Sequence, residues 1–379
     1  MPNYVQQSGT QSTFPINGPQ ISRVYSQAAI SDYVPMSTLP PALAAVSISP
    51  PAFEVTAVAE AVARQFALQG SYEQLVSERD QNFRLQADDG RQYVIKIVSS
   101  GEDDEATAFQ IGVLRHLQQA DDVIVPAVVP TIHGDSSGEI ATADTRYCLR
   151  AVTWVEGEPL ESGHVDEAMA QQFGVALARL GMALQGYTHP GEDQALAWDL
   201  QRVGELSGLL ENIDEDGIRA AVSCAINDYT RRVIPAIRDL PAQVIHGDAN
   251  LGNVLAIGGG VAFIDFGDVV KAPRVFDLAI AAAYLRPTDD NLLLLIAPFI
   301  AGYHSVARLE SLELDLLFDL IRARLATTIT MLYWRLSAKD ADDPYRLKTL
   351  EQESGAARFL GLLDDLGRQR FRQKLSNIQ

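Results

Sequence analysis

The side chains of this chain that can do chemistry lie in two neighbouring segments, residues 244–255 and 261–268. The first reads Val-Ile-His-Gly-Asp-Ala-Asn-Leu-Gly-Asn-Val-Leu and contains Asp248 and Asn253 in the pattern D-x-x-x-x-N. The second reads Val-Ala-Phe-Ile-Asp-Phe-Gly-Asp and contains Asp265. Each begins with a short apolar run, typical of a β-strand, and continues into polar residues, typical of a loop. Carboxylates and an amide are therefore expected on adjacent loops.

This set of side chains meets the needs of phosphoryl transfer. The reaction needs a carboxylate to orient the attacking hydroxyl and oxygen ligands for the magnesium ion that neutralises the phosphates. We expect Asp248 to be the base, with Asn253 and Asp265 as metal ligands. The simpler interpretation, a strand–turn–strand unit with solvated polar turns, requires three such side chains to coincide by chance.

The combination H-G-D-x-x-x-x-N with I-D-x-x-D resembles the aminoglycoside phosphotransferase and choline kinase superfamily. Its distant relatives, the protein kinases, carry H-R-D-x-x-x-x-N and D-F-G at matching places. Gly247 stands where those enzymes have Arg. The resemblance implies an α+β, protein-kinase-like fold of two lobes, with an antiparallel sheet plus a helix in the N-lobe and a mainly helical C-lobe. It also implies ATP and Mg²⁺ as cofactors.

Two further runs resemble one branch of that superfamily, the hydroxylysine kinases and the phosphotransferase part of aminotransferase fusions. They are Ser-Glu-Arg-Asp-Gln-Asn-Phe-Arg at 77–84 and the segment 324–335, which is followed by Asp-Pro-Tyr at 343–345. The branch implies an ATP-dependent small-molecule kinase that phosphorylates a hydroxyl of an amino alcohol or a hydroxylated amino acid. Aminoglycoside, homoserine and choline-type acceptors stay open.

Two other interpretations lie outside small-molecule phosphorylation. A catalytically weak nucleotide-binding regulator is favoured by a glycine-free phosphate loop and opposed by the intact Asp248, Asn253 and Asp265. A protein kinase is disfavoured, because no activation loop with an Ala-Pro-Glu signature follows Asp268.

The elements that must position these residues follow from the periodicity of apolar side chains. Residues 1–50, rich in Ser, Gln, Pro and Thr, are expected to be a mobile or loosely docked tail, 51–155 a kinase-like N-lobe, and 156–379 a helical C-lobe that carries the catalytic loops. The N-lobe is predicted to contain a helix at 54–68, strands at 72–76, 82–86 and 92–98, a helix at 104–118, and two strands about the turn 136–138 that lead to 146–154. The C-lobe is predicted to contain helices near 165–186, 196–210, 213–237, 289–307, 312–336 and 344–371.

Several N-lobe residues are expected to bind the nucleotide. Lys96 lies on the third strand, and the resemblance implies that it reaches the α- and β-phosphates. Ser77 and Asn82 lie on the first loop, where they can cap the phosphates in place of glycine amides. Gln110 stands where the family usually places a Glu that pairs with this lysine, so it can accept a hydrogen bond from Lys96 but brings no charge.

The segment 153–160, Thr-Trp-Val-Glu-Gly-Glu-Pro-Leu, resembles the family's hinge between lobes. Adenine is expected to bond to backbone groups near Thr153 and Val155. In the C-lobe, His246 and Asp277 are expected to brace the catalytic loop without taking part in the chemistry. Asp268 is the nearest carboxylate in the sequence for an amino group of the substrate.

A second His-Gly-Asp tripeptide ends at Asp135, but no Asn follows in register, so it is interpreted as a hairpin turn.

The composition narrows the partners. The 379 residues carry a net charge of −19, which repels nucleic acid and anionic membranes and favours a cationic acceptor. No apolar run approaches the ~18 residues of a membrane helix, and no signal peptide is recognisable. Cys148 and Cys224 lack metal-ligand spacing and fit reduced, buried thiols of a cytoplasmic protein. The oligomeric state is left open.

Overall fold

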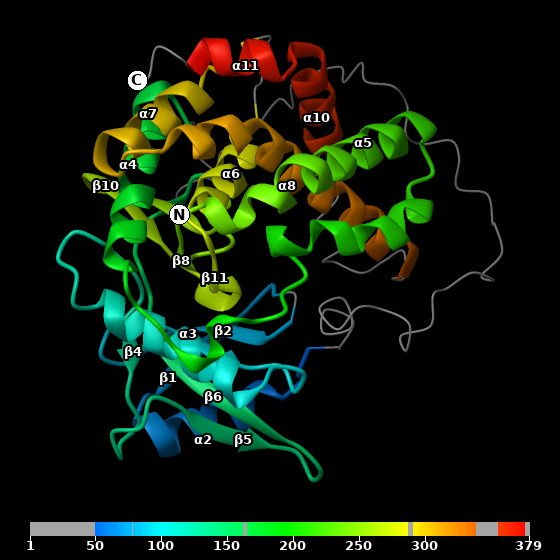
Figure 1. Ribbon diagram of the computed structural model, residues 1–379. Helices are drawn as coiled ribbons and strands as arrows, with labels where there is room; N and C mark the ends of the chain where they lie inside the picture. The colour runs from blue at the N-terminus through cyan, green and yellow to red at the C-terminus, as the bar shows by residue number, and fades with distance from the viewer. Residues whose placement is uncertain (1–49, 78, 162–164, 287–290, 339–354, 376–379) are drawn as a thin grey trace, which may run out of the picture. The chain divides into compact units, whose positions relative to one another are not determined.

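The computed structural model of the protein describes residues 50–77, 79–161, 165–286, 291–338 and 355–375 (Figure 1). All of them belong to one unit, Met36–Gln379. The tail expected at residues 1–50 lies outside the described residues except for its last position. We call the described residues up to 155 the N-lobe and those from 156 onward the C-lobe, which is the division expected from the sequence.

The N-lobe is built on an antiparallel sheet, whose described strands run in the order β1-β2-β3-β6-β4 with β5 paired to β6. The strands are β1 (Gly70–Leu75), β2 (Gln81–Ala87), β3 (Gln92–Ile97), β4 (Val128–Val129), β5 (Gly138–Ala141) and β6 (Arg146–Thr153). Helix α2 (Val55–Phe66) precedes the sheet, and α3 (Asp104–Leu117) follows β3. This order confirms the predicted succession of helices and strands.

A tight turn sets the register of the strand that carries Lys96. Gly90, between β2 and β3, has a φ of 86°, which glycine adopts without strain. The resulting register pairs Lys96 with Asn82 on β2, and β6 brings Arg150 opposite Lys96 on the other side. Because side chains alternate along a strand, the neighbours of Lys96 enter the core instead. That core joins the sheet to α2 and includes Val58, Val62, Phe83, Leu85, Ile95, Ile97 and Leu149.

The C-lobe is mainly helical, with two small sheets beside the helices (Figure 1). Its helices are α4 (Glu167–Ala183), η3 (Pro190–Glu192), η4 (Leu200–Asn212), α5 (Asp216–Arg232), η5 (Ile234–Asp239), η6 (Phe266–Asp268), α6 (Val275–Tyr284), α7 (Ile296–Val306), α8 (Ser311–Ala338), α10 (Gly355–Leu366) and α11 (Arg368–Leu375). Its strands are β7 (Glu158–Pro159), β8 (Ala242–Ile245), β9 (Val254–Ile257), β10 (Gly260–Phe263) and β11 (Val270–Pro273). The antiparallel sheet followed by helices confirms the α+β prediction.

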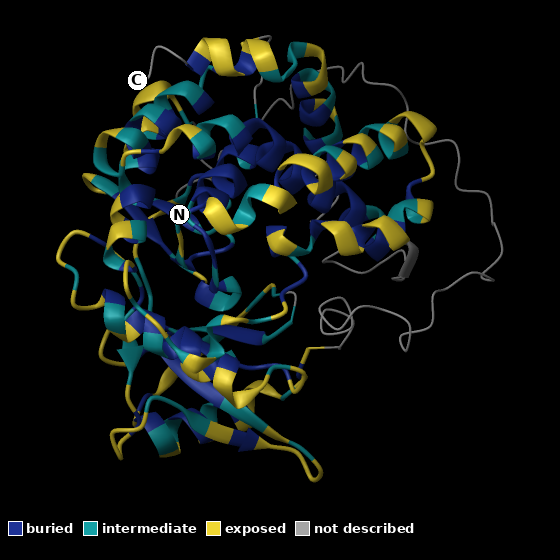
Figure 2. Cartoon of the chain, in the orientation of Figure 1, coloured by how far each residue is buried: buried dark blue, intermediate teal, exposed yellow. Residues whose placement is uncertain are grey.

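The C-lobe core is continuous over α4 to α8, and its centre at α6 appears dark blue in Figure 2. Helices α4 and α7 approach so closely at Gly174 that a Cβ atom there would overlap the carbonyl oxygen of Phe299. In the part of the chain that the structure describes, no helix combines the length and apolar character needed to cross a membrane.

Three details of the C-lobe differ from the sequence-based expectation. The segment predicted as an α-helix at 196–210 forms the 3₁₀ helix η4, and its buried residues, Leu200, Val203, Leu206 and Leu209, recur at the three-residue period of that helix. The helix predicted at 344–371 is two helices, because Gly367 has a φ of 73° and ends α10; residues 344–354 lie outside the described residues. Helix α6 was not predicted, because Val275–Ala283 are all buried and show no amphipathic period.

Candidate active site

Strand pairing brings the two catalytic loops together. Strands β9 and β10 pair so that Val254 lies opposite Phe263. Asn253 immediately precedes β9 and Asp265 follows β10, so both stand at the same end of this hairpin. The backbone N–H of Ile264 donates to the carbonyl of Asn253 at 2.9 Å, which extends the pairing to the loops. Asp248 lies on the loop that joins β8 to β9.

Buried polar groups hold the loop that contains Asp248. The Asp277 carboxylate accepts from the backbone N–H of His246 at 2.9 Å and of Gly247 at 2.8 Å. The His246 ring contacts the Ile264 carbonyl through Nε2 at 3.1 Å and accepts from the Asp248 N–H through Nδ1 at 3.2 Å. Burial raises the pKa of Asp277, and the His246 ring and these N–H groups oppose the rise. These contacts confirm that His246 and Asp277 brace the loop.

Gly247 is required by the backbone of the same loop. Its φ is 78°, in the left-handed region, and a Cβ atom there would overlap the carbonyl oxygen of Asp268. The loop that contains Asp248 therefore packs directly on the backbone of Asp268, at the end of the segment that contains Asp265. A side chain at position 247, such as the Arg of protein kinases, does not fit this arrangement.

Asp248 is held by three donors. Its Oδ1 accepts from Arg324 Nη2 at 2.7 Å, and its Oδ2 accepts from Asn250 Nδ2 at 2.8 Å and from Asn253 Nδ2 at 3.0 Å. Burial raises the pKa of Asp248, whereas the Arg324 guanidinium opposes the rise. A carboxylate in this setting can orient a hydroxyl and hold its proton.

Asp265 joins the second loop to the N-lobe. Its Oδ1 accepts from Lys96 Nζ at 2.8 Å, and this ammonium holds the pKa of Asp265 well below its usual range. The φ of Asp265 is 58°, in a left-handed region that non-glycine residues seldom occupy. The structure thus brings together the expected phosphate-binding lysine and the expected metal ligand.

Gln110 does not make the expected contact with Lys96. Its Oε1 accepts from Arg150 Nη2 at 2.5 Å, and its Nε2 donates to the Gly267 carbonyl at 3.2 Å. Arg150 lies opposite Lys96 on the neighbouring strand β6, and its longer side chain reaches α3. The prediction of a Lys96–Gln110 hydrogen bond is therefore wrong for this structure.

The N-lobe loop between β1 and β2 contacts the C-lobe through a residue that was not predicted. The Arg79 guanidinium donates to Asp268 at 2.7 Å. Ser77 Oγ instead accepts from the backbone of Asp80 at 3.3 Å and shapes the loop itself. Asn82 is buried, and its Oδ1 has no hydrogen-bond partner among the described residues. Of the two predicted phosphate-capping residues, Ser77 and Asn82, it is Asn82 that lies opposite Lys96.

The two hinge residues differ in what their backbones can offer. The Thr153 N–H donates to the Ala127 carbonyl at 2.8 Å, and Thr153 Oγ1 accepts from the Ala127 N–H at 2.8 Å. The N–H and Oγ1 of Thr153 are therefore engaged in the sheet, and the expected adenine contact near Thr153 stays a prediction. Val155 lies beyond β6, and its backbone makes no hydrogen bond to the backbone of another described residue.

The side-chain oxygen atoms of Asn253 and Asp265, at the ends of the two loops, are suited to bind a hard divalent cation. Asn253 Nδ2 donates to Asp248, so its carbonyl oxygen points the other way, and the Asp265 side chain is 49% exposed. Carboxylate and amide oxygens are the ligands that Mg²⁺ prefers, and Mg²⁺ commonly takes one or two of them together with phosphate oxygens. No group of three His, Cys, Asp or Glu side chains is arranged to hold a metal in the described ranges. Asn253 and Asp265 are the residues that can hold the ion of a bound nucleotide.

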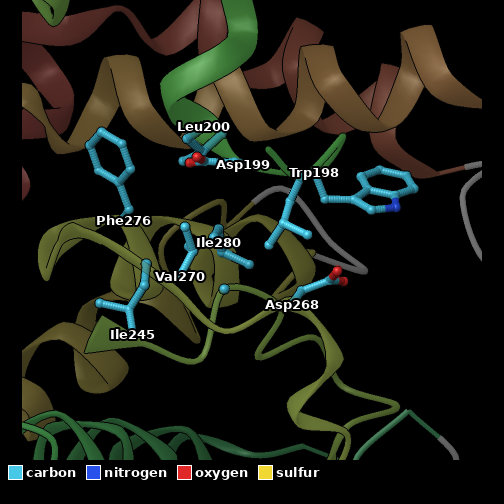
Figure 3. A pocket seen from close by; sticks show the side chains of 10 residues that line it. Trp198, Asp199, Leu200, Ile245, Asp268, Val270, Phe276 and Ile280 are labelled. Atoms are coloured by element: carbon cyan, nitrogen blue, oxygen red, sulfur yellow. The ribbon is translucent and has the colours of Figure 1, made fainter. Parts of the chain in front are cut away.

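A small pocket adjoins the loop of Asp248 (Figure 3). Its free volume is about 10 Å³, close to that of one water position, so it is a packing gap rather than a substrate cavity. Trp198 and Asp268 lie on one side of it, away from Phe276 (Figure 3). Asp199, beside Trp198, is buried, and burial raises its pKa to about 6.

Arg324 is the second contact that sequence reasoning missed. It lies on α8, and 76 positions separate it from Asp248 in the sequence. The signal was present, since Arg324 is a charged residue within a run whose members are nearly all buried. Only the packing of α8 against the catalytic loop could identify its partner.

Comparisons with known proteins agree with this geometry. A family described as "Phosphotransferase enzyme family" matches residues 71–314. Hydroxylysine kinase of Mus musculus is 26% identical over 285 residues, 68% of this chain and 75% of that protein. An amicoumacin kinase solved with AMP-PNP and Ca²⁺ has a TM-score of 0.65 and 16% identity, and covers 83% of this chain and 95% of its own. A microcompartment-associated aminopropanol kinase has a TM-score of 0.64 and 19% identity, over 85% of this chain and 98% of its own. The structural likeness confirms the predicted kinase-like fold.

Proposed function

Because the chain belongs to the phosphotransferase enzyme family, we propose that it is an ATP-dependent kinase of a hydroxylated amino acid or amino alcohol, with Asp248 as the base. The observation that supports this most directly is the convergence of Asp248, Asn253 and Asp265 on one hairpin end, with Lys96 bonded to Asp265. These are the parts that phosphoryl transfer requires.

In the proposed reaction the acceptor hydroxyl oxygen attacks the γ-phosphorus of ATP. The bond between that phosphorus and the oxygen bridging to the β-phosphate breaks, and ADP leaves. The hydroxyl proton passes to Asp248, whose burial favours the protonated form. Arg324, Asn250 and Asn253 hold the carboxylate in a fixed orientation, so little reorganisation is needed during transfer.

We propose that nucleotide binding separates Lys96 from Asp265, the ion pair that joins the two lobes. Asp265 and Asn253 would hold Mg²⁺, which supplies charge neutralisation to the phosphates. Lys96 would move from Asp265 to the α- and β-phosphates. Asn82 is buried opposite Lys96, and its Oδ1 has no partner among the described residues. Of the predicted loop residues, it is the one best placed to bind the phosphates together with Lys96. The N–H and carbonyl of Val155 are proposed to bind adenine.

The acceptor class is proposed from the relatives. The mouse relative is named for hydroxylysine, and the aminopropanol kinase is named for an amino alcohol. Both acceptors carry an ammonium group next to a hydroxyl-bearing chain. A net charge of −19 favours such an acceptor electrostatically.

A screen of acceptors tests the proposal. The full chain is incubated with ATP and Mg²⁺ and a panel of 5-hydroxylysine, aminopropanol, homoserine, choline and aminoglycosides, and phosphorylated products are identified by mass spectrometry. We expect a phosphate monoester of 5-hydroxylysine or of an amino alcohol. ATP binding without transfer to any member of the panel would instead favour the nucleotide-binding regulator, for which the absence of an acidic partner for Lys96 on α3 is the supporting observation.

A further inference from the structure

Arg79 extends from the N-lobe loop between β1 and β2 to the C-lobe. This loop lies where protein kinases place a glycine-rich cover over the phosphates. Arg79 Nη2 donates to Asp268 Oδ1 at 2.7 Å, across 189 positions of the sequence. The side chains of Arg79 and Asp268 are 24% and 13% exposed, so both can be reached from solvent.

The two residues that follow Arg79 are bonded within the N-lobe instead. Asp80 Oδ1 accepts from the backbone N–H of Ser99 at 3.1 Å. The Gln81 side chain accepts from the Phe53 N–H at 2.8 Å and donates to the Phe53 carbonyl at 2.9 Å. These bonds fix the end of the loop, so the direction of Arg79 toward the C-lobe is a built feature of the loop.

The Arg79 guanidinium lies beside the expected metal ligand. A Cβ atom on Gly267 would stand 3.3 Å from Asp265 Oδ1 and 3.4 Å from Arg79 Nη2, so both atoms lie close to the same point of the backbone. The charge of Asp265 is among those that raise the pKa of Arg79, after the larger effect of Asp268. In kinases the metal ion bridges the β- and γ-phosphates, so a cation beside its ligand is suited to the terminal phosphate.

Two ion pairs with the same arrangement join the lobes. Lys96 bonds to Asp265, and Arg79 bonds to Asp268. In both pairs the cation comes from the N-lobe sheet or its loop, and the carboxylate comes from the segment after β10. The proposed function already assigns Lys96 to the phosphates. The second cation therefore stands in the same relation to the nucleotide as the first.

We propose that Arg79 binds the terminal phosphate of a nucleoside triphosphate, and that it exchanges Asp268 for this phosphate when the nucleotide binds. A guanidinium presents its N–H donors in a planar fork that matches two phosphate oxygens. Arg79 would thus supply by a side chain the donors that glycine amides supply in protein kinases. A nucleoside diphosphate lacks the group that Arg79 recognises. This inference rests on the proposed function and adds a phosphate-binding residue to it.

Equilibrium binding tests the inference without turnover. Isothermal titration of the full chain with Mg²⁺ measures Kd for ADP and for AMP-PNP, and the ratio of the first to the second isolates the terminal phosphate. In Arg79→Met this ratio should fall about tenfold or more below wild type, the size of effect of a hydrogen bond to a charged group, while ADP affinity stays within about threefold. Arg79→Lys should retain part of the ratio, because an ammonium keeps the charge but not the fork.

A second variant should change the ratio in the opposite direction. Asp268→Asn removes the carboxylate that competes for Arg79, so the ratio should rise about threefold or more above wild type. This variant keeps Arg79, so its result does not depend on the folding of Arg79→Met. Arg91→Met is the matched control, because Arg91 bonds to Asp89 in the same lobe with side chains 71% and 46% exposed. It should keep the wild-type ratio.

Three outcomes would overturn the inference. An unchanged ratio in Arg79→Met would show that the terminal phosphate is bound by other residues. Equal losses of ADP and AMP-PNP affinity in this variant would assign Arg79 to the shape of the loop. A ratio that does not rise in Asp268→Asn would show that Asp268 does not compete for Arg79. In each case phosphorylation of an acceptor by the wild type would still support the proposed kinase, whereas failure of the wild type to bind either nucleotide would contradict both proposals.

Discussion

Asp265 shows how one residue can be shaped for a ligand. Its left-handed backbone, with a φ of 58°, costs about 1–3 kcal/mol in a non-glycine residue, and such costs concentrate at functional sites. The conformation leaves its carboxylate half exposed, with Lys96 as its bonded partner. In the proposed cycle Asp265 would hold the metal ion in place of Lys96, and Lys96 would bind the phosphates.

Asp265→Asn should uncouple nucleotide binding from the metal. Asn tolerates the left-handed conformation, so the loop should stay folded, but a neutral amide is a weaker Mg²⁺ ligand. Isothermal titration should show ATP affinity about tenfold or more below wild type with Mg²⁺. Without the metal it should equal or exceed wild type, because Lys96 is no longer held. An exposed control, Asp239→Asn, should behave as wild type. The same Mg²⁺ dependence in Asp265→Asn and wild type would contradict the role of Asp265.

The residues that could be predicted from the sequence were those that lie in short motifs shared with the resembled family. His246 and Asp277 were expected to brace the catalytic loop, and their hydrogen bonds confirm it. Arg79 and Arg324 were missed, because each reaches its carboxylate from an element far away in the sequence. Gln110 was assigned from the place where the family has a Glu that pairs with the lysine, whereas Arg150 on the next strand bonds to the same amide, a contact that depends on strand register.

At the scale of elements, the 3₁₀ helix η4 carries a buried carboxylate at its start. Asp199 accepts from the Gln201 N–H at 2.9 Å and from its Nε2 at 3.1 Å, which caps the helix. Burial raises its pKa from 3.8 to about 6. Since Trp198 precedes it and contacts Arg324, this cap also fixes one wall of the site.

The pH dependence of stability should reveal this cap. A carboxyl whose pKa is higher in the folded state binds protons more tightly when folded, so its charge destabilises the fold as pH rises from about 4 to about 6. Asp199→Asn retains an acceptor but does not titrate. Unfolding free energies are measured by urea denaturation for the variant and the wild type. The value for the variant minus that for the wild type should increase by up to about 3 kcal/mol between pH 4 and pH 7. A constant difference across this range would show that Asp199 is not buried as described.

The N-lobe elements could be predicted more fully than those of the C-lobe, for physical reasons. Alternating strands and an Asp-Gly turn give strong local signals, as in β2 and β3. In contrast, α6 is buried on all sides, and β7 has only two residues paired to β9, so neither leaves a periodic pattern. The three-residue repeat of η4 was visible but was read as an α-helix, since the two periods are close.

At the scale of the whole molecule, charge separates two ligands of opposite sign. The net charge of −19 repels ATP at long range, while Lys96 and Arg79 supply positive charge at the site itself. A cationic acceptor is attracted over the same distance. Salt screens charges separated by more than about 10 Å at 0.1 M, so these long-range effects are open to experiment.

Ionic strength should therefore act unequally on acceptors. Between about 10 mM and 200 mM KCl, at saturating ATP, the KM of an acceptor with net positive charge should rise by about twofold or more, because long-range attraction is screened. The KM of a zwitterionic acceptor such as homoserine should change less. Equal changes for both would show that the acidic surface does not steer the acceptor.

The most direct test of the central claim compares two aspartates that each end a His-Gly-Asp tripeptide. Asp248→Asn should reduce kcat for acceptor phosphorylation by about 1,000-fold or more, while ATP affinity stays within about threefold of wild type, because the base is lost but the phosphate and metal ligands remain. Asp135→Asn, in the exposed N-lobe turn, should leave both unchanged. Asp248→Asn with near-wild-type turnover would contradict the account of this site.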